Sequence, residues 1–389
     1  PNSPSMPAFF KKHGYWTGGV GKIYHNTKTD PGDIAWHKNL RFENDELPAV
    51  TEARKKFEAE RGSVDDRKNK KGWKALRIKV GGPLTSQTPP GHGPSGLRDD
   101  QHKDGKNARQ VVEWLDQRKQ DEKQPFFIIC GIQKPHVPFL APDKYFKLYP
   151  TKGISYDPNP VDDWDDVPTL ALVKRSVSFG FEWGKENDAL RREYMQAYHA
   201  CVTFIDAQIG LVLKKLKEQK LWDDTIVVFT SDHGYHLGEH YLWGKVTLFE
   251  ESARVPLIVR VPGITRPKTR SPVLVELVDL FPTLAELCDL PAPKELQGRS
   301  LFEVLDKPEF QRRGSAYTVV SRGTQLGRSV RTARWRYAEW GKAREAELYD
   351  LKDDPREIHN LAQAKQHKKT LVEMRALLVQ RQKEAASAR

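Results

Sequence analysis

Short apolar runs and one long amphipathic stretch dominate the pattern of hydrophobic positions along the chain. The runs at 126–130 (FFIIC), 225–230 (TIVVFT) and 256–261 (PLIVRV) lack polar alternation, which is typical of buried parallel strands. Between the first two runs, apolar residues recur every three or four positions from Arg191 to Leu216, which predicts a long helix with one buried face. A strand, a helix and a second strand in this order indicate a doubly wound α/β fold.

The pattern changes on either side of this core. Residues 44–106 are polar and rich in Lys, Asp, Gly and Pro, so we expect irregular insertions over the sheet there. The C-terminal part instead shows short segments with strand character and a final helical stretch, at 316–320, 329–332, 335–340 and 371–382. We therefore expect a large domain over residues 1–298 and a small α+β domain over residues 299–389.

Composition narrows the classes of partner. Lys and Arg outnumber Asp and Glu by 64 to 52, a formal charge of +12 that favours anionic partners. The basic runs carry no nucleic-acid-binding motif, so nucleic acid is not an expected partner. No apolar stretch is long enough to predict a membrane span, residues 1–10 show no signal-peptide pattern, and nothing indicates an oligomeric state. Three widely spaced cysteines are expected to be small buried apolar residues, and they leave the compartment open.

Reactive side chains directly follow three predicted strands. Ligands of open α/β sheets bind beyond the carboxyl ends of the strands, where these groups are expected to meet. Asp232 and His233 follow one strand, and the others are followed by Lys134 and His136 and by Lys22 and His25. A carboxylate and an imidazole at one strand end can both reach a cation. On these two residues alone, an Asp that caps a turn beside a His that only packs is an equal alternative.

The stretch from Thr225 to Gly263 resembles the sulfatase family of the alkaline phosphatase superfamily, particularly its iduronate 2-sulfatase-like and choline-sulfatase-like branches. This stretch reads TIVVFTSDHGYHLGEHYLWGKVTLFEESARVPLIVRVPG, and GYWTGGVGKIYH, KPHVPF, VELVDLFPTLAELCDLP and ELYDLKDDPREIHNLA match in family order. The resemblance runs from Pro7 to about Ala362. It implies an alkaline-phosphatase-like doubly wound mixed sheet with a smaller C-terminal α+β domain, and hydrolysis of a sulfated carbohydrate or another sulfate monoester.

The resemblance also implies a calcium ion and a formylglycine, made from Cys or Ser, as the catalytic groups. Asp232 and His233 match the later pair of metal ligands, and Lys245 of WGK matches the lysine that holds a sulfate oxygen. His136 of KPH matches the histidine beside the ester oxygen and is the candidate general acid. The alternative for His136 is a side chain that satisfies a backbone carbonyl in a Pro-bounded loop.

Lys22 and His25, spaced as KxxH, match the pair that contacts the formylglycine in this family. The resemblance gives Lys22 the role of a fixed positive charge and His25 that of the base that helps to release sulfate. Tyr235 flanks the DHG motif, as does Trp243, and a place in the sugar pocket and simple packing are equally open for both. Lys134 is interpreted as a surface charge.

The family's nucleophile motif, CxPSR or SxPSR, does not occur in the 389 residues, and neither does the Asp pair that completes the metal site. Because residues 7–25 match the part that follows the nucleophile helix, we expect the missing segment to precede Pro1. The rivals are a phosphoester or phosphonate hydrolase with another nucleophile, a subunit completed by another chain, and a non-catalytic sulfoglycan-binding pseudoenzyme. Export to a periplasmic, extracellular or lysosomal compartment is expected from the resemblance alone.

Overall fold

The computed structural model describes residues 4–25, 29–43, 47–86, 90–120, 124–172, 185–310, 312 and 314–387. Its α-helices are α1 (Met6–Lys12), α2 (Pro48–Arg61), α3 (Lys70–Gly81), α4 (Lys103–Gln120), α5 (Asp143–Phe146), α6 (Asp188–Glu218), α7 (Glu250–Ala253), α8 (Leu280–Leu287), α9 (Phe302–Asp306) and α10 (Lys368–Ser387). Its strands are β1 (Trp16–Gly21), β2 (Lys38–Leu40), β3 (His92–Pro94), β4 (Phe126–Gly131), β5 (Phe139–Ala141), β6 (Val227–Thr230), β7 (His236–Leu237), β8 (Trp243–Gly244), β9 (Leu257–Arg260), β10 (Ala316–Arg322), β11 (Gln325–Arg331), β12 (Trp335–Trp340) and β13 (Glu345–Asp350). None of the helices in these ranges is long and apolar enough to cross a membrane.

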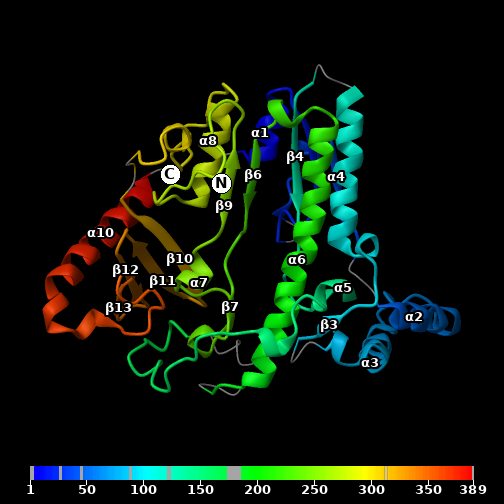
Figure 1. The fold of residues 1–389 in the computed structure, drawn as a ribbon, viewed down its shortest axis with the longest axis horizontal. Coiled ribbons are helices and arrows are strands. Elements are labelled where there is room, and N and C mark those ends of the chain that lie inside the picture. Colours follow the sequence, from blue (N-terminus) through cyan, green and yellow to red (C-terminus); the bar gives the residue numbers. More distant parts are fainter. Residues whose placement is uncertain are drawn as a thin grey trace.

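The core is a parallel sheet with helices on both faces. Its strands follow the order β2-β1-β4, and Trp16 of β1 lies opposite Phe126 of β4. On one face α4 and α6 run along the strands (Figure 1), and Trp114 of α4 packs edge-on against Trp16 with ring centroids 5.5 Å apart. On the other face α1 stacks Phe10 on Phe127, with ring centroids 4.5 Å apart. The α/β class predicted from the sequence is confirmed.

The two remaining predicted core strands differ from expectation in their direction and burial. β6 and β9 pair with each other in antiparallel fashion, with Val227 opposite Arg260. Phe229 of β6 is 36% exposed and Ile258 of β9 is 62% exposed, so the prediction of buried parallel strands is wrong for this pair. Within the described ranges, β4 and β6 each pair along one edge only. Apolar strands become fully buried only when neighbours cover both edges and both faces, and this cover is incomplete here.

The C-terminal part is an antiparallel meander, β10-β11-β12-β13, covered by α10. Tyr337 and Met374 pack between this sheet and α10, whereas Trp340 and Tyr349 pack on the opposite face against Phe249 of the large domain. The expected strands and terminal helix are present, and β13 was missed. The small sheet therefore lies between its own helix and the segment that precedes α7, and Figure 1 shows it beside α7.

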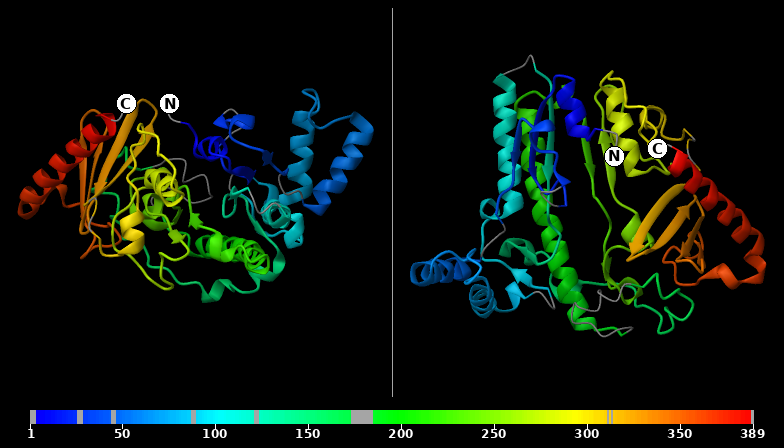
Figure 2. Two further views of the ribbon diagram at one scale, coloured as in Figure 1. Left: turned by 90° about the horizontal axis from the view of Figure 1, so that it is seen from above. Right: turned by 180° about the vertical axis from the view of Figure 1, so that it is seen from behind.

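Residues 47–86 form two antiparallel helices rather than the irregular insertion that the sequence predicted; 44–46 and 87–89 lie outside the described residues. We call α2 and α3 together the helical hairpin, and Figure 2 shows it projecting from the body of the molecule. Phe57 of α2 packs against Trp73 of α3 with ring centroids 5.7 Å apart. Composition misled the prediction because an exposed helix is polar on most of its surface and shows only a weak apolar stripe.

A buried ion pair joins the C-terminal sheet to the large domain. Arg336 of β12 is 1% exposed and donates its Nε–H to Glu357, which is fully buried. The other carboxylate oxygen of Glu357 accepts the backbone N–H of Glu250 at the start of α7, at 2.7 Å. The guanidinium also lies over the ring of Phe249, 5.0 Å from its centroid. One carboxylate thus holds a strand of the small sheet and a helix of the large domain together.

Glu357→Ala should lower the free energy of unfolding by about 3–5 kcal/mol, because it leaves the Arg336 charge buried without its closest counter-ion. Urea unfolding followed by circular dichroism measures the change. Glu345→Ala, an exposed carboxylate at the edge of the same sheet, is the matched control and should change stability by less than about 0.5 kcal/mol. Equal losses in the two variants would contradict a special role for the Glu357 carboxylate.

Candidate active site at the strand ends

The ends of β1 and β6 meet although they are far apart in the sequence. The Lys22 ammonium lies 3.1 Å from Oδ2 of Asp232, a contact between residues 210 positions apart. A glycine also lets the end of β1 lie close to the end of β4: a Cβ on Gly21, whose φ is +83°, would lie 2.1 Å from the carbonyl oxygen of Gly131. The rule that reactive groups gather beyond parallel strand ends correctly predicted this meeting point.

His233 presents an unpaired ring nitrogen beside this carboxylate. Its Nδ1–H donates to the carbonyl oxygen of Gly234 at 2.7 Å, which leaves Nε2 without a proton in the neutral ring. Nε2 is buried and has no hydrogen-bond partner among the described residues, and Oδ1 of Asp232 is 3.6 Å away. Burial lowers the pKa of His233, with Lys245 and Lys22 adding to the effect, so the neutral ring is favoured.

Asp232 and His233 fit two positions of a metal site. A ring that donates one N–H to a carbonyl while its other nitrogen lacks a partner has the orientation of a metal-ligating histidine. The Asp232 side chain is 63% exposed and its carboxylate oxygens suit a hard cation. Calcium takes about six to eight oxygen ligands, and no group of three or more candidate ligands occurs in the part of the chain that the structure describes. The two side chains alone are therefore too few to complete a calcium site.

His136 lies in a loop that α4 fixes. The Asp104 carboxylate accepts the backbone N–H groups of Gln133 and Lys134, at 2.8 and 2.7 Å. His136 donates its Nδ1–H to the carbonyl oxygen of Val137 at 2.8 Å, as in the backbone-satisfying alternative, and this bond leaves Nε2 free to act. Burial lowers the pKa of His136, and the charges of Lys245, Lys22 and Lys134 lower it further. His136 thus lies in the same electrostatic environment as the two site lysines.

Lys245 directly follows β8, and a residue of the C-terminal sheet holds the backbone next to it. Lys245 lines the same groove as Lys22 and Asp232, and its pKa is lowered by burial and by Lys22 and raised by Asp232. The next residue, Val246, has φ of +71°, which is unfavourable for a β-branched side chain. Arg322 of β10 donates to the carbonyl oxygen of Val246 at 2.5 Å and also to that of Leu170. The C-terminal sheet thereby fixes the backbone beside Lys245.

A buried ion pair holds the segment between His233 and Lys245. His240 and Asp163 are 1% and 2% exposed, and His240 Nδ1 lies 3.1 Å from the Asp163 carboxylate. Burial opposes the charged ring, but the carboxylate prevails and raises the pKa of His240. Trp164 donates its indole N–H to the carbonyl oxygen of His240 at 2.7 Å. The structure thus anchors this loop through residues that lie before α6.

The predicted site residues other than His136 divide between a groove and a buried aromatic cluster. Lys22, His25, Asp232, His233 and Lys245 line one groove, and His25 is exposed there. Tyr235 packs against Phe139 and Tyr198, with ring centroids 6.0 and 5.7 Å apart, and Trp243 is buried in the same cluster. Their packing favours the structural alternative for both aromatic residues, and a substrate contact of Tyr235 remains a prediction.

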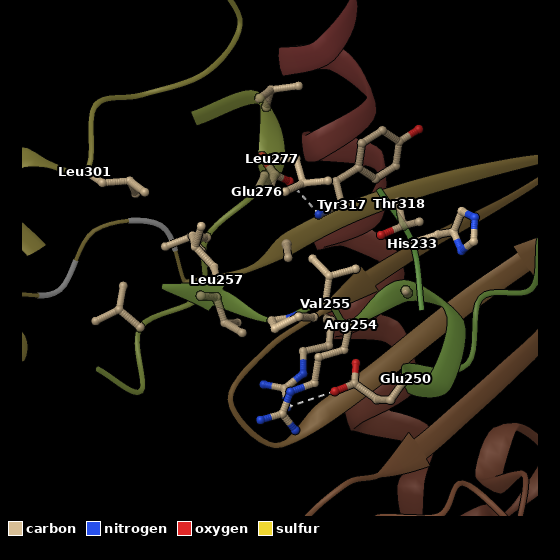
Figure 3. Close-up of a pocket in the computed structure, with 18 of the residues that line it drawn as sticks. His233, Glu250, Arg254, Val255, Leu257, Glu276, Leu277, Leu301, Tyr317 and Thr318 are labelled. Carbon is tan, nitrogen blue, oxygen red and sulfur yellow. Dashed lines mark hydrogen bonds and ion pairs between the residues drawn. The ribbon is translucent and has the colours of Figure 1, made fainter. Parts of the chain in front are cut away.

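The groove continues from the strand ends along β9. Figure 3 shows His233 at one end, Leu301 at the other, and Arg254, Val255 and Leu257 between them. Arg331 of β11 lies across from β9, where it contacts Glu250 at 3.4 Å. The groove therefore has a cationic end at the strand termini and a more apolar middle, lined by both domains.

Sequence reasoning missed the residues that position the site, namely Asp104, Asp163 and Arg322. Each lies outside the matched motifs and acts through a backbone or side-chain contact 29 to 77 positions away in the sequence. Composition gives no signal for such partners. Asp163 is the exception, because its position next to Trp164 in the short segment DDWDD distinguishes it from ordinary surface residues.

Comparison with known proteins agrees with this geometry. The sulfatase family model matches residues 1–290, and the model of the N-sulphoglucosamine sulphohydrolase C-terminal region matches residues 238–384. A sulfatase of Formosa agariphila is 31% identical over 387 residues, which cover 96% of this chain and 68% of that protein. The iduronate 2-sulfatase of Mus musculus is 28% identical over 448 residues, with 94% and 77% covered.

Solved structures share the fold. A protein in complex with its substrate D-glucosamine-2-N,6-O-disulfate superposes with a TM-score of 0.73 at 20% identity, covering 99% of this chain and 83% of that one. A phosphonate monoester hydrolase from Silicibacter pomeroyi gives 0.74 at 21% identity, with 98% and 80% covered. The matched family model covers most of the chain, and the first relative is similar along nearly all of it. This chain therefore belongs to the sulfatase family of sulfuric ester hydrolases.

Proposed function

We propose that the complete protein removes sulfate from a sulfated carbohydrate, with calcium as its metal. The observation that carries this proposal is the Lys22–Asp232 ion pair beside His233, in a groove that Lys245 also lines, in a member of the sulfatase family. The names of the relatives support the substrate class, since they include iduronate 2-sulfatases, and so does the solved neighbour that holds a disulfated glucosamine.

Lys245 and Lys22 bind the sulfate group in this proposal. Burial lowers the pKa of His136 and of Lys245, and the charge of Lys22 lowers both further, although Lys22 is itself paired with Asp232. A sulfate ester would reduce this repulsion, and charge-assisted hydrogen bonds to its oxygens are stronger than neutral ones. The same cations would stabilise the charge that develops as the ester bond breaks.

Calcium, when bound, would polarise the sulfate as a Lewis acid. Asp232 and His233 would hold it, His233 through the Nε2 atom that lacks a hydrogen-bond partner among the described residues. The Lys22 ammonium, 3.1 Å from Asp232, would then share that carboxylate with the metal.

His136 acts on the leaving alcohol. Its lowered pKa favours the neutral ring, because burial and three lysine charges oppose protonation. A bound sulfate would offset those charges and raise the pKa of His136 toward neutrality, the range that general acid catalysis needs. His136 can then donate a proton to the ester oxygen, while His25 at the groove surface would assist the release of sulfate.

We further propose that the nucleophile, a formylglycine, and the remaining metal ligands belong to a segment outside the 389 residues. The strands β4 and β6 support this proposal, because each has an unpaired edge within the described ranges and their apolar residues are half-exposed. Val227 of β6 and Phe126 of β4 belong to one apolar cluster, so the two edges are neighbours. A strand between them would complete the sheet and end beside Lys22 and Asp232.

A phosphonate or phosphoester hydrolase is the second candidate. The likeness to a phosphonate monoester hydrolase favours it as much as the likeness to the disulfate-bound protein favours a sulfatase, since the TM-scores are 0.74 and 0.73. Both chemistries need cations around a tetrahedral oxyanion. Turnover of an aryl sulfate and an aryl phosphonate by the complete protein tests the proposed function, and a preference for the phosphonate would overturn it.

The 389-residue chain alone should not hydrolyse nitrophenyl sulfate. It supplies positive charge and positioning, and the proposed nucleophile lies elsewhere. Release of nitrophenol over hours at millimolar substrate measures this. If the chain turns over, and Asp232→Ala turns over equally well, an unrelated site is responsible.

In the complete protein, Asp232→Ala should abolish stabilisation by calcium, because ligand that binds only the folded state adds stability. The wild-type protein should gain about 2.7 kcal/mol at a calcium concentration of 100 Kd. Thermal unfolding with calcium or a chelator measures the gain. Asp223→Ala is the control, since this 90% exposed carboxylate pairs with Arg260 away from the groove, and it should respond like the wild type. A calcium response that survives in Asp232→Ala would remove Asp232 from the ligand set.

Lys245→Ala should weaken the binding of free sulfate as well as turnover, because Lys245 holds sulfate before and during reaction. The expected loss in binding is about 1.5–3 kcal/mol, the range for a hydrogen bond to a charged group. Titration with sodium sulfate measures it in the complete protein. Unchanged sulfate affinity would place Lys245 outside the binding site.

His136→Ala should lower turnover by about 10²- to 10⁴-fold with little change in substrate binding. The loss should be several-fold larger on a sugar sulfate than on nitrophenyl sulfate, since nitrophenolate leaves without a proton. Because the acidic form is needed, sugar-sulfate turnover by the wild type should fall as pH rises through the pKa of His136, and the variant should lose this dependence. Equal defects on both substrates would contradict a general-acid role.

A further inference from the structure

The second helix of the helical hairpin carries an unusual concentration of positive charge. Residues 67–79 hold seven cations and no acidic residue, and five of these cations lie in α3 itself, against a formal charge of +12 for the whole chain. The seven cations are Arg67, Lys68, Lys70, Lys71, Lys74, Arg77 and Lys79. All but Arg77 are exposed, and within the described part of the chain none of the seven forms an ion pair. This segment is therefore a strongly cationic surface rather than a mixed solvated face.

The neighbouring helix shows what an ordinary solvated face looks like in this molecule. In α2, Lys55 pairs with Glu52 at 2.8 Å and Arg54 with Glu58 at 3.4 Å, at the i,i+3 and i,i+4 spacings that stabilise helices. In α3, Lys70 and Lys74 stand four residues apart, where like charges destabilise a helix. Two of these lysines also occupy the first turn, which the helix dipole disfavours and no acidic residue compensates.

The helical hairpin is anchored beside the candidate active site. Trp73 of α3 and Val50 of α2 pack in one cluster with Leu140 of β5. β5 begins at Phe139, three residues after His136. α3 therefore packs against the short strand that follows the His136 loop. Figure 2 shows the helical hairpin extending outward from the body of the molecule.

We propose that α3 is a second binding surface for a sulfated polysaccharide, on which Lys70, Lys71 and Lys74 bind sulfate groups of the chain whose ester is presented to the active site. This proposal rests on the proposed function and extends it from a sulfated sugar to a polymer with several sulfates. A polyanion would offset both unfavourable features of α3, the like-charge spacing and the cations in the first turn. Its attraction would also raise the rate of encounter at low salt.

The test measures binding of the 389-residue chain to a heparin decasaccharide and a heparin disaccharide by isothermal titration in 0.15 M NaCl. Lys70→Ala/Lys71→Ala/Lys74→Ala should weaken decasaccharide binding at least tenfold and make its salt dependence shallower. The control is Lys365→Ala/Lys368→Ala/Lys369→Ala, which removes three exposed lysines and the same net charge at the start of α10. The control should stay within twofold of the wild type, as should disaccharide binding by both variants.

Three results would overturn the proposal. One is an equal loss of decasaccharide affinity in the two triple variants, which would indicate net charge alone. Another is wild-type affinity in the α3 variant. The third is tighter binding of a 20-base-pair DNA duplex than of the decasaccharide, lost in the α3 variant, which would assign the surface to nucleic acid.

Failure of the proposed function would give a different result. Titration needs no turnover, so α3-dependent binding by a complete protein that hydrolyses no sulfate ester would refute the function and leave the surface in place. In a complete protein that does hydrolyse nitrophenyl sulfate, the α3 triple variant should keep this activity within twofold, because none of its three lysines lines the groove that holds Lys22, Asp232 and Lys245. Loss of that activity would show that α3 supports the fold of the site instead.

Discussion

The candidate site depends on holding several positive charges close together around one carboxylate. Lys22 contacts Asp232 directly, while Lys245 and Lys22 depress the pKa of His136 and of His233. Like charges in a partly buried site repel, so the arrangement persists only because the chain around each group is fixed. An oxyanion bound there, as in the proposed function, would relieve this repulsion. Stability and binding are thus opposed at this end of the sheet.

Distant polar contacts supply the rigidity. The Asp104 carboxylate fixes the His136 loop, the His240–Asp163 pair fixes the segment before Lys245, and Arg322 fixes the backbone after it. The first contact is partly buried and the second fully buried, where an unmatched polar group would cost about 1–3 kcal/mol, whereas the Arg322 contact is exposed. The positive φ of Val246 is tolerated because its surroundings leave the backbone no alternative. Strain and charge repulsion at the site are therefore offset by hydrogen bonds elsewhere in the fold.

The sequence correctly predicted the helices and strands that are determined by a local pattern of apolar residues. The apolar runs located β4, β6 and β9, periodicity located α6, and the rule about strand ends placed Lys22 beside Asp232. Prediction failed where long-range cover or pairing decides the outcome, as in the half-exposed β9 and its antiparallel direction. It also failed for α2 and α3, whose charged surfaces hide their apolar stripe. The supporting contacts of Asp163 and Arg322 span 77 and 76 positions, and no property of either residue alone reveals them.

The contact of Arg322 with Val246 has an evolutionary consequence. The two family models overlap at residues 238–290, the stretch that contains Lys245 and the start of α7. The C-terminal sheet reaches into this stretch through Arg322 and Glu357, so it is not an independent module appended to a catalytic domain. A recombination event that exchanged this sheet for that of a relative would also exchange the support of the backbone beside Lys245. Residues of β10 and β11 also line the groove, so a change in this sheet can alter both the groove and the support of the backbone beside Lys245.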